Sequence, residues 1–133
     1  MAVVVTPLYA GLLAVLLVVL SVHTIRQRRH ARAALGDRGA PHLQRAIRAH
    51  GNFTEYVPLA LLLLVLVEWT QHPLWLLHVL GLTLLVGRAV HAWGITRPEE
   101  NFRWRVTGMA MTFTVLLTSA VVLLIHSVAA TLG

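Results

Sequence analysis

Polar and charged side chains stand directly before the second long apolar segment of the chain. Four such residues precede or enter this run, which extends to Val67: Arg45, Arg48, Asn52 and Glu55. Guanidinium groups bind carboxylates and phosphates through paired hydrogen bonds, whereas carboxylate and amide oxygens accept hydrogen bonds from an ammonium group. The set therefore suits a small zwitterionic ligand with excess carboxylate, such as a short peptide.

The composition identifies the environment in which such a ligand would be bound. Of the 133 residues, 57% are hydrophobic and only 12% are charged, and the mean hydropathy is +0.73. A chain of this size is too hydrophobic for a small soluble domain and is long enough for several membrane spans. We therefore expect an all-α membrane protein that forms one domain over residues 1–133.

Charge and cysteine content exclude several functions. The net charge of +6 comes from eleven basic residues, all arginine, but they flank apolar segments and no soluble module could enter a nucleic-acid groove. We therefore expect no nucleic-acid partner. Because the chain has no cysteine, it has no thiolate metal ligand and no cysteine nucleophile. The histidines show no ligand spacing, so we expect no metal site, and any thiol must come from a ligand.

Four apolar segments are each close to the roughly 20 residues that a helix needs to cross a bilayer. They cover approximately residues 3–25, 53–71, 74–94 and 105–128. The first segment resembles a signal peptide only superficially, because no basic residue precedes it and an arginine-rich run follows it. We expect it to be retained, giving a four-helix transmembrane bundle.

The arginines also orient this bundle. Seven of them fall between the first and second segments, and three lie in or beside the connection before the fourth segment. The positive-inside rule makes that end cytoplasmic and places both termini outside. Trp93 and Trp104 are then expected at the inner interface, and Trp69 and Trp75 at the outer one. Glu68 is expected in the outer headgroup layer.

This topology brings polar groups from every helix to the inner end. On the second helix, the four residues from Arg45 to Glu55 fall within an arc of about 80°. The other helices add Arg26 with His23, Arg88 with His91, and Arg105. Ionisable residues at membrane depth mark functional sites unless they are paired. Arg88 has two open interpretations, an ion pair with Glu55 or contact with a ligand. Gly108, Thr112 and Ser119 form a small-residue stripe suited to helix packing.

The segments "RAIRAHGNFTEYVPLALLLL", "VGRAVHAWG" and "RVTGMAMT" resemble the MAPEG family, membrane-associated proteins in eicosanoid and glutathione metabolism that include microsomal glutathione transferases. The resemblance covers nearly the whole chain and is greatest to the small bacterial inner-membrane members. Its most specific element is the Arg-x-x-x-Asn-x-x-Glu pattern of Arg48, Asn52 and Glu55, with Pro58 just beyond.

The resemblance implies a homotrimer in the bacterial inner membrane that binds glutathione, as a co-substrate, between subunits near the cytoplasmic face. By this analogy Arg48, Asn52 and Glu55 hold the peptide, Arg88 and His91 line the same pocket, and Arg26 reaches it from the first helix. Arg105 corresponds approximately to a family arginine beside the glutathione sulfur, which makes it the candidate catalytic residue.

The implied reaction is attack of glutathione thiolate on an apolar electrophile or a lipid hydroperoxide dissolved in the membrane. A free thiol has a pKa of about 8.5, and lowering it by two units requires about 2.7 kcal/mol, which a guanidinium at low dielectric can supply. Two positions depart from the family pattern. Gly51 stands where some eicosanoid-pathway members carry arginine, and Ile95 stands where some carry tyrosine, which argues against prostaglandin or leukotriene chemistry.

Two functions from other classes remain open. A small-molecule exporter would also have four spans and a membrane carboxylate, but its carboxylate is expected nearer mid-membrane and its basic bias weaker. A non-catalytic membrane scaffold or regulatory subunit would keep the fold and lose the chemistry. Formation of thiolate on addition of glutathione distinguishes both from a transferase.

Overall fold

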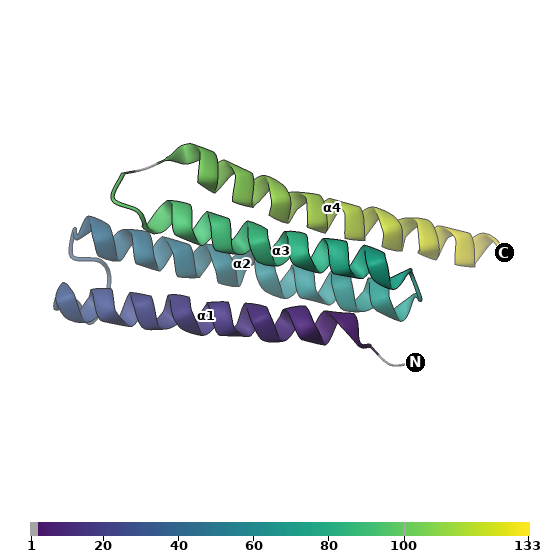
Figure 1. Cartoon of the computed structure of the whole chain (residues 1–133), viewed down its shortest axis with the longest axis horizontal. Helices are drawn as coiled ribbons and strands as arrows, with labels where there is room; N and C mark the ends of the chain where they lie inside the picture. Colours follow the sequence, from purple (N-terminus) through teal and green to yellow (C-terminus); the bar gives the residue numbers. More distant parts are fainter. Residues whose placement is uncertain (1–2, 100) are drawn as a thin grey trace.

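Four long helices make up nearly all of the computed structural model, which describes residues 3–99 and 101–133. They are α1 (Val5–His30), α2 (Pro41–Trp69), α3 (Leu74–Thr96) and α4 (Phe102–Leu132), as Figure 1 shows. Each is long and apolar enough to cross a membrane. The predicted all-α architecture with four spans is therefore confirmed.

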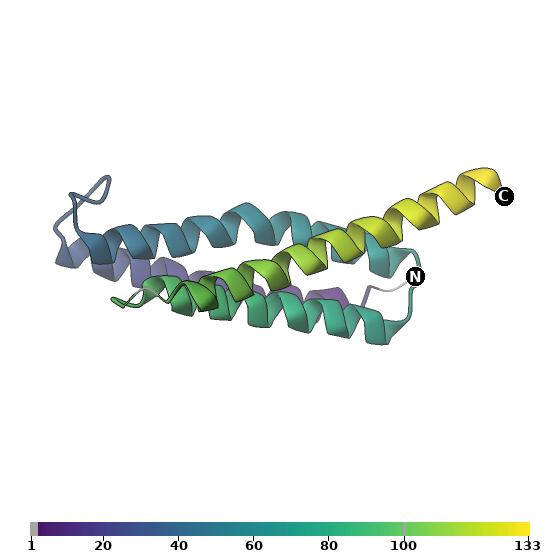
Figure 2. The same ribbon diagram turned by 90° about the horizontal axis from the view of Figure 1, so that it is seen from above.

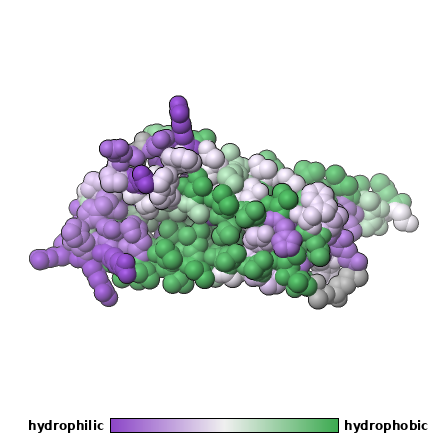
Figure 3. Space-filling model, in the orientation of Figure 1, coloured by the Kyte–Doolittle hydropathy of each residue, from purple (hydrophilic) through white to green (hydrophobic). Residues whose placement is uncertain are grey.

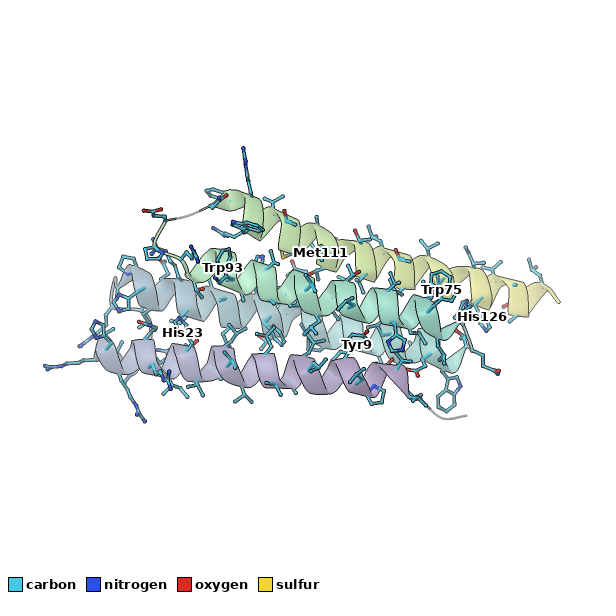
Figure 4. The ribbon with its side chains drawn as sticks, viewed as in Figure 1. Tyr9, His23, Trp75, Trp93, Met111 and His126 are labelled. Atoms are coloured by element: carbon cyan, nitrogen blue, oxygen red, sulfur yellow. The ribbon has the colours of Figure 1, made fainter. Side chains whose placement is uncertain are left out.

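The helices alternate in direction, which places the α1–α2 and α3–α4 connections at one end and both termini at the other (Figure 1). The first of these ends, here called the basic end, carries much of the hydrophilic surface, and the apolar side chains cover the middle (Figure 3). His23 and Trp93 lie toward the basic end, whereas Trp75 and His126 lie toward the other (Figure 4). Trp93 and Trp75 thus occupy opposite ends, as interfacial tryptophans do.

Two helices extend further at the basic end than hydropathy predicts. α1 continues past Ile25 to His30, and α2 begins at Pro41, well before the apolar run. The polar residues beyond the apolar runs continue the helical hydrogen bonding of their segments, and proline is favoured in the first turn of a helix. The connection turns instead at Gly36 and Gly39, whose φ angles of +65° and +71° suit glycine. The polar residues before the second apolar run therefore lie on one continuous helix.

The α2–α3 hairpin is as tight as predicted. Only residues 70–73 separate the two helices, and Pro73 is the N-cap of α3 with a φ of −56°. Pro58 lies inside α2 without ending it. The α4 N-terminus is closed by Asn101, whose side chain accepts a hydrogen bond from the backbone N–H of Arg103 at 3.1 Å.

Glycines let α3 and α4 approach closely. A Cβ atom added at Gly108 would meet the backbone of Gly87 and of His91, and one added at Gly87 would meet Met111. α4 crosses the bundle obliquely, and its C-terminal part projects beyond the other helices (Figure 2). Thr112 and Ser119 are fully buried on the same stripe. The predicted role of the stripe in helix packing is confirmed, and the stripe is not available to another chain.

Glu68, expected in the outer headgroup layer, lies at the end of α2 opposite the basic end. Its carboxylate is buried and accepts hydrogen bonds from the backbone N–H groups of Val5 at 2.7 Å and Thr6 at 2.8 Å, and also from that of Val4. The first N–H groups of a helix have no partner within it, so a carboxylate there completes them and favours the helix dipole. Glu68 thus fastens the start of α1 to the end of α2.

Replacing Gly108 by alanine is expected to destabilise the bundle by about 1–3 kcal/mol, because the new methyl group must push against the backbone of α3. The matched control is Gly11→Ala on α1, where an added Cβ meets nothing within 4 Å. There the change should be neutral or stabilising by up to about 1 kcal/mol, since alanine favours helix. Unfolding in detergent, followed by circular dichroism, measures both; equal effects would contradict the close contact.

Replacing Glu68 by alanine should lower stability by about 1–3 kcal/mol, because buried N–H groups at the start of α1 lose their acceptor. Glu68→Gln, which keeps one acceptor oxygen, should lose less. Glu99→Ala removes an exposed carboxylate near the basic end and should change stability by less than about 0.5 kcal/mol. Hydrogen exchange of the first turn of α1 localises the effect, and an unchanged rate in Glu68→Ala would refute it.

Candidate functional site

A buried guanidinium, that of Arg88, lies between α2, α3 and α4. The residue is 0% exposed. One terminal nitrogen donates to Asn52 Oδ1 on α2 at 2.5 Å, and the other contacts Thr112 Oγ1 at 3.3 Å and Met109 Sδ at 3.6 Å on α4. All three partners are uncharged, and the buried Nε has no partner. Arg88 is therefore a hydrogen-bonded cation without a counter-ion among the described residues.

Glu55 does not supply that counter-ion. Its side chain is exposed on α2, and within residues 3–99 and 101–133 it makes no ion pair with Arg88. Of the two interpretations left open by the sequence, the Glu55–Arg88 pair is thus absent from the single chain. Burying a charge without an opposite charge is costly, which makes Arg88 a candidate partner for an anion.

Asn52 connects this buried cation to the surface. It is half-buried on α2, one helical turn from the exposed residues Arg48 and Glu55. Residues at such spacing share one side of a helix. Tyr56 lies on the same side, with its ring centroid 6.0 Å from the Arg88 guanidinium carbon and 5.6 Å from the Phe113 ring. Half-buried Asn52 therefore lies between buried Arg88 and the exposed side chains of Arg48 and Glu55.

His91 and Arg105 meet where α3 and α4 approach. The backbone carbonyl of Arg105 accepts a hydrogen bond from His91 Nδ1 at 3.1 Å, which fixes the proton on Nδ1. Nε2, buried and without a partner, is then an acceptor in neutral imidazole. The Arg105 guanidinium lies over the Phe102 ring at 5.2 Å. Both residues border a groove of about 420 Å³ that Met109 and Phe113 also line.

Arg26 is separate from this cluster in the single chain. It is exposed on α1, which contacts α2 and α3 but not α4. All four helices bring polar groups to the basic end, as predicted. The structure joins Asn52 to Arg88 and His91 to Arg105, leaves Arg48 and Glu55 beside Asn52, and leaves Arg26 apart. Within residues 3–99 and 101–133, no three His, Asp or Glu side chains are grouped as metal ligands.

Sequence reasoning missed two partners of Arg88. Thr112 was assigned to helix packing alone, yet its hydroxyl donates to the Gly108 carbonyl at 2.9 Å and accepts from Arg88. Met109 was not considered. Their positions toward Arg88 depend on how α4 crosses α3, which no pattern within one helix reveals. The sequence places Tyr56 next to Glu55 and four residues after Asn52, so it shares the side of α2 that Asn52 occupies.

Comparison with known proteins places most of the chain in one family. The model of the MAPEG family matches residues 6–125. The inner membrane protein YecN of Escherichia coli strain K12 is 42% identical over 113 residues, which are 85% of this chain and 85% of that protein. YecN of Escherichia coli O6:H1 strain CFT073 is similar to the same extent. The residues that the family model matches, 6–125, include Arg88, Asn52 and every other predicted site residue.

A double-mutant cycle tests the contact between Asn52 and Arg88. Asn52→Leu alone should cost about 2–3 kcal/mol, because it removes an acceptor from a buried guanidinium. Adding Arg88→Met should then cost little or restore stability, since no buried charge remains. We expect a coupling of about 1.5–3 kcal/mol, measured from unfolding in detergent.

The control cycle pairs Asn52→Leu with Arg48→Met, which removes an exposed guanidinium one turn away on α2. Its coupling should stay below about 0.5 kcal/mol. If the Arg88 and Arg48 cycles gave the same coupling, the buried contact would have no special role in stability.

Proposed function

Because this chain belongs to the MAPEG family, we propose that it is a membrane-bound glutathione-dependent transferase or peroxidase. One observation carries the proposal. Arg88 is a fully buried cation whose partners are all neutral, and half-buried Asn52 links it to a surface where Arg48 and Glu55 are exposed. A ligand carboxylate placed at this opening would supply the missing negative charge.

The charges of glutathione match those of the opening. The peptide carries two carboxylates and one ammonium group, so it has the excess of negative charge that two guanidinium groups favour. Arg48 and Arg88 would bind the carboxylates, and Glu55 would accept from the ammonium group. The Asn52 amide, already bonded to Arg88 through its oxygen, has its NH₂ left to donate.

Arg105 is the proposed catalytic residue. A guanidinium beside the sulfur stabilises the thiolate relative to the thiol, so more of the bound glutathione is in its nucleophilic form. In transfer, the thiolate forms a carbon–sulfur bond with the electrophile, whose leaving group departs with the bonding electrons. In peroxidase turnover, two glutathiones reduce one lipid hydroperoxide to its alcohol and water and are oxidised to the disulfide.

The second substrate would enter from the membrane. The groove beside His91 and Arg105 continues over Val106, Ala110 and Phe113, so an apolar molecule in the bilayer can reach a thiolate held near Arg105. The protein then contributes mainly proximity and a fixed positive charge. His91 Nε2, an acceptor in the neutral ring, is available to a ligand N–H or O–H.

The complete site is proposed to form between subunits of a homotrimer. The backbones of α1 and α4 of one chain are not neighbours, which supports a ligand that contacts Arg105 of one chain and Arg26 of the next. The number three comes from the family resemblance. We place the trimer in the inner membrane, as for YecN, with the basic end cytoplasmic and both termini periplasmic.

A second candidate is a non-catalytic scaffold or regulatory protein of the same fold. It is favoured by Ile95, which is buried in the apolar core where some catalytic members carry tyrosine. A scaffold would keep the helix contacts at Gly87 and Gly108 without binding glutathione. The two candidates therefore differ in one measurable property, formation of a glutathione thiolate.

Calorimetry of glutathione binding to the protein in mild detergent, with thiolate absorbance measured in the same samples, tests the proposal. Saturable binding with a thiolate band is expected for the wild type. Arg48→Ala and Glu55→Ala should each weaken binding at least about tenfold, since each removes a charged partner worth roughly 1.5–3 kcal/mol. Arg105→Gln should retain binding and lose most of the thiolate.

The control is Arg103→Gln, which removes an exposed guanidinium two residues from Arg105 and should leave both signals unchanged. Light scattering on the same samples reports the oligomer. Folded wild-type protein that binds no glutathione would overturn the transferase proposal and leave the scaffold.

A further inference from the structure

Three hollows follow one another along α1 and are here together called the groove: the first two lie between α1 and α2, and the third lies between the end of α1 and the connection after it. The first, of about 270 Å³, lies in the membrane-spanning part and is lined almost entirely by apolar atoms, including Leu13, Leu17 and Val57. Its α1 residues follow helical spacing, and one turn beyond Leu17 the next hollow begins at Ser21. The groove thus continues toward the basic end.

The second hollow, of about 260 Å³, is lined by polar side chains of both helices. Ser21 donates its hydroxyl proton to the Leu17 carbonyl at 2.8 Å, so at 3.1 Å it accepts from His50 Nε2. This arrangement does not activate the serine as a nucleophile, because its proton is directed at the backbone and not at the imidazole. Thr24 lies one turn beyond Ser21. The Thr24 hydroxyl donates to the Leu20 and Ala46 carbonyls, so the protons of Ser21, Thr24 and His50 Nε2 are all used within the chain. Arg28 therefore supplies the hydrogen-bond donors of this hollow.

The third hollow, of about 360 Å³, shares Ile25 and Arg28 with the second and adds Arg29 and Arg32. Arg28 uses one N–H to hold the Gly36 carbonyl at 2.9 Å and keeps the others for a ligand. The side chains of Arg29 and Arg32 are exposed. Three guanidinium groups therefore surround one hollow at the level where the chain leaves the membrane.

We propose that this groove binds one anionic phospholipid. An acyl chain would occupy the apolar hollow, the ester region would lie beside Ser21 and His50, and the phosphate would be held by Arg28, Arg29 and Arg32. Along the groove, polar and then additional cationic residues join an apolar lining, in the order of groups along a phospholipid. Basic pockets between helices at the cytoplasmic surface bind anionic headgroups by the same electrostatics.

Charge decides between a lipid and a second copy of the chain in the groove. The chain carries a net charge of +6, and seven of its eleven arginines lie between residues 26 and 48. A second copy packed here would place no negative charge beside these arginines, because it carries the same net positive charge. An anionic lipid neutralises them and fills the apolar hollow.

This site is independent of the proposed glutathione site. The groove residues of α2, such as Ile47, His50 and Thr54, lie on average roughly 130° around the helix from Arg48, Asn52 and Glu55, at about 100° per residue. Failure of glutathione binding would therefore leave the lipid site untouched, and the reverse also holds.

Native mass spectrometry of the full chain in mild detergent, titrated with phosphatidylglycerol or with phosphatidylcholine of the same acyl chains, tests the proposal. We expect one tightly held phosphatidylglycerol per chain and at least tenfold weaker phosphatidylcholine. The double variant Arg29→Gln/Arg32→Gln should weaken phosphatidylglycerol about 30-fold, roughly fivefold for each charge near the membrane surface. Among the described residues, neither side chain makes a hydrogen bond that its loss would break.

The matched control, Arg97→Gln/Arg103→Gln, removes the same charge at the same end from the other connection and should change phosphatidylglycerol affinity less than threefold. Equal losses in the two double variants would overturn the site, because they would indicate a diffuse charge effect. Equal affinity of the wild type for the two lipids would also overturn it.

A second pair of variants tests the acyl chain. Ala14→Phe fills the apolar hollow, whereas Val19→Phe places the same ring on the opposite side of α1. Ala14→Phe alone should reduce retention of phosphatidylglycerol at least fivefold. Unchanged retention, or a changed oligomer mass with the lipid still bound, would overturn the proposal, and the changed mass would place another chain in the groove.

Discussion

The burial of the Arg88 guanidinium constrains the whole basic half of the bundle. An ionised side chain inside an apolar bundle is costly unless it is hydrogen-bonded, and here α2 and α4 must be in register with α3 to bond its two terminal nitrogens. Asn52 comes from α2, and Thr112 and Met109 come from α4. Any shift of one helix along another would leave donors of a buried cation unpaired.

Two other contacts hold the helices in that register. At the α3–α4 crossing, Gly87 and Gly108 allow backbones to approach so closely that Thr112 reaches Arg88 and the Arg105 carbonyl reaches His91. At the far end, the Glu68 carboxylate takes up the free N–H groups of α1. Without a hydrophobic driving force between helices in lipid, close packing and hydrogen bonds of this kind determine how they associate.

The two proposed ligand sites use opposite sides of α2 at the same end of the molecule. On one side, Arg48 and Glu55 lie beside Asn52, the partner of Arg88. An anionic ligand there would supply the counter-ion that Arg88 lacks among the described residues. On the other side, Arg28, Arg29 and Arg32 contribute the positive charges, and apolar side chains of α1 and α2 line the first hollow of the groove. Arginine serves both sites because its planar fork binds carboxylate and phosphate alike and stays charged at membrane depth.

Composition and periodicity alone determined the four spans, the single domain and the end at which polar residues gather, because bilayer thickness and backbone hydrogen bonding leave few alternatives. The spacing of Arg48, Asn52 and Glu55 likewise predicted that they share one side of α2. Only the tertiary structure decided that Arg88 pairs with Asn52 and not with Glu55, that Glu68 caps α1, and that the stripe at Gly108 is used within the chain. These outcomes depend on how far one helix is rotated and shifted against the next. The rotation and shift of one helix against another depend on contacts between side chains from separate segments. The pattern within one segment therefore does not predict them.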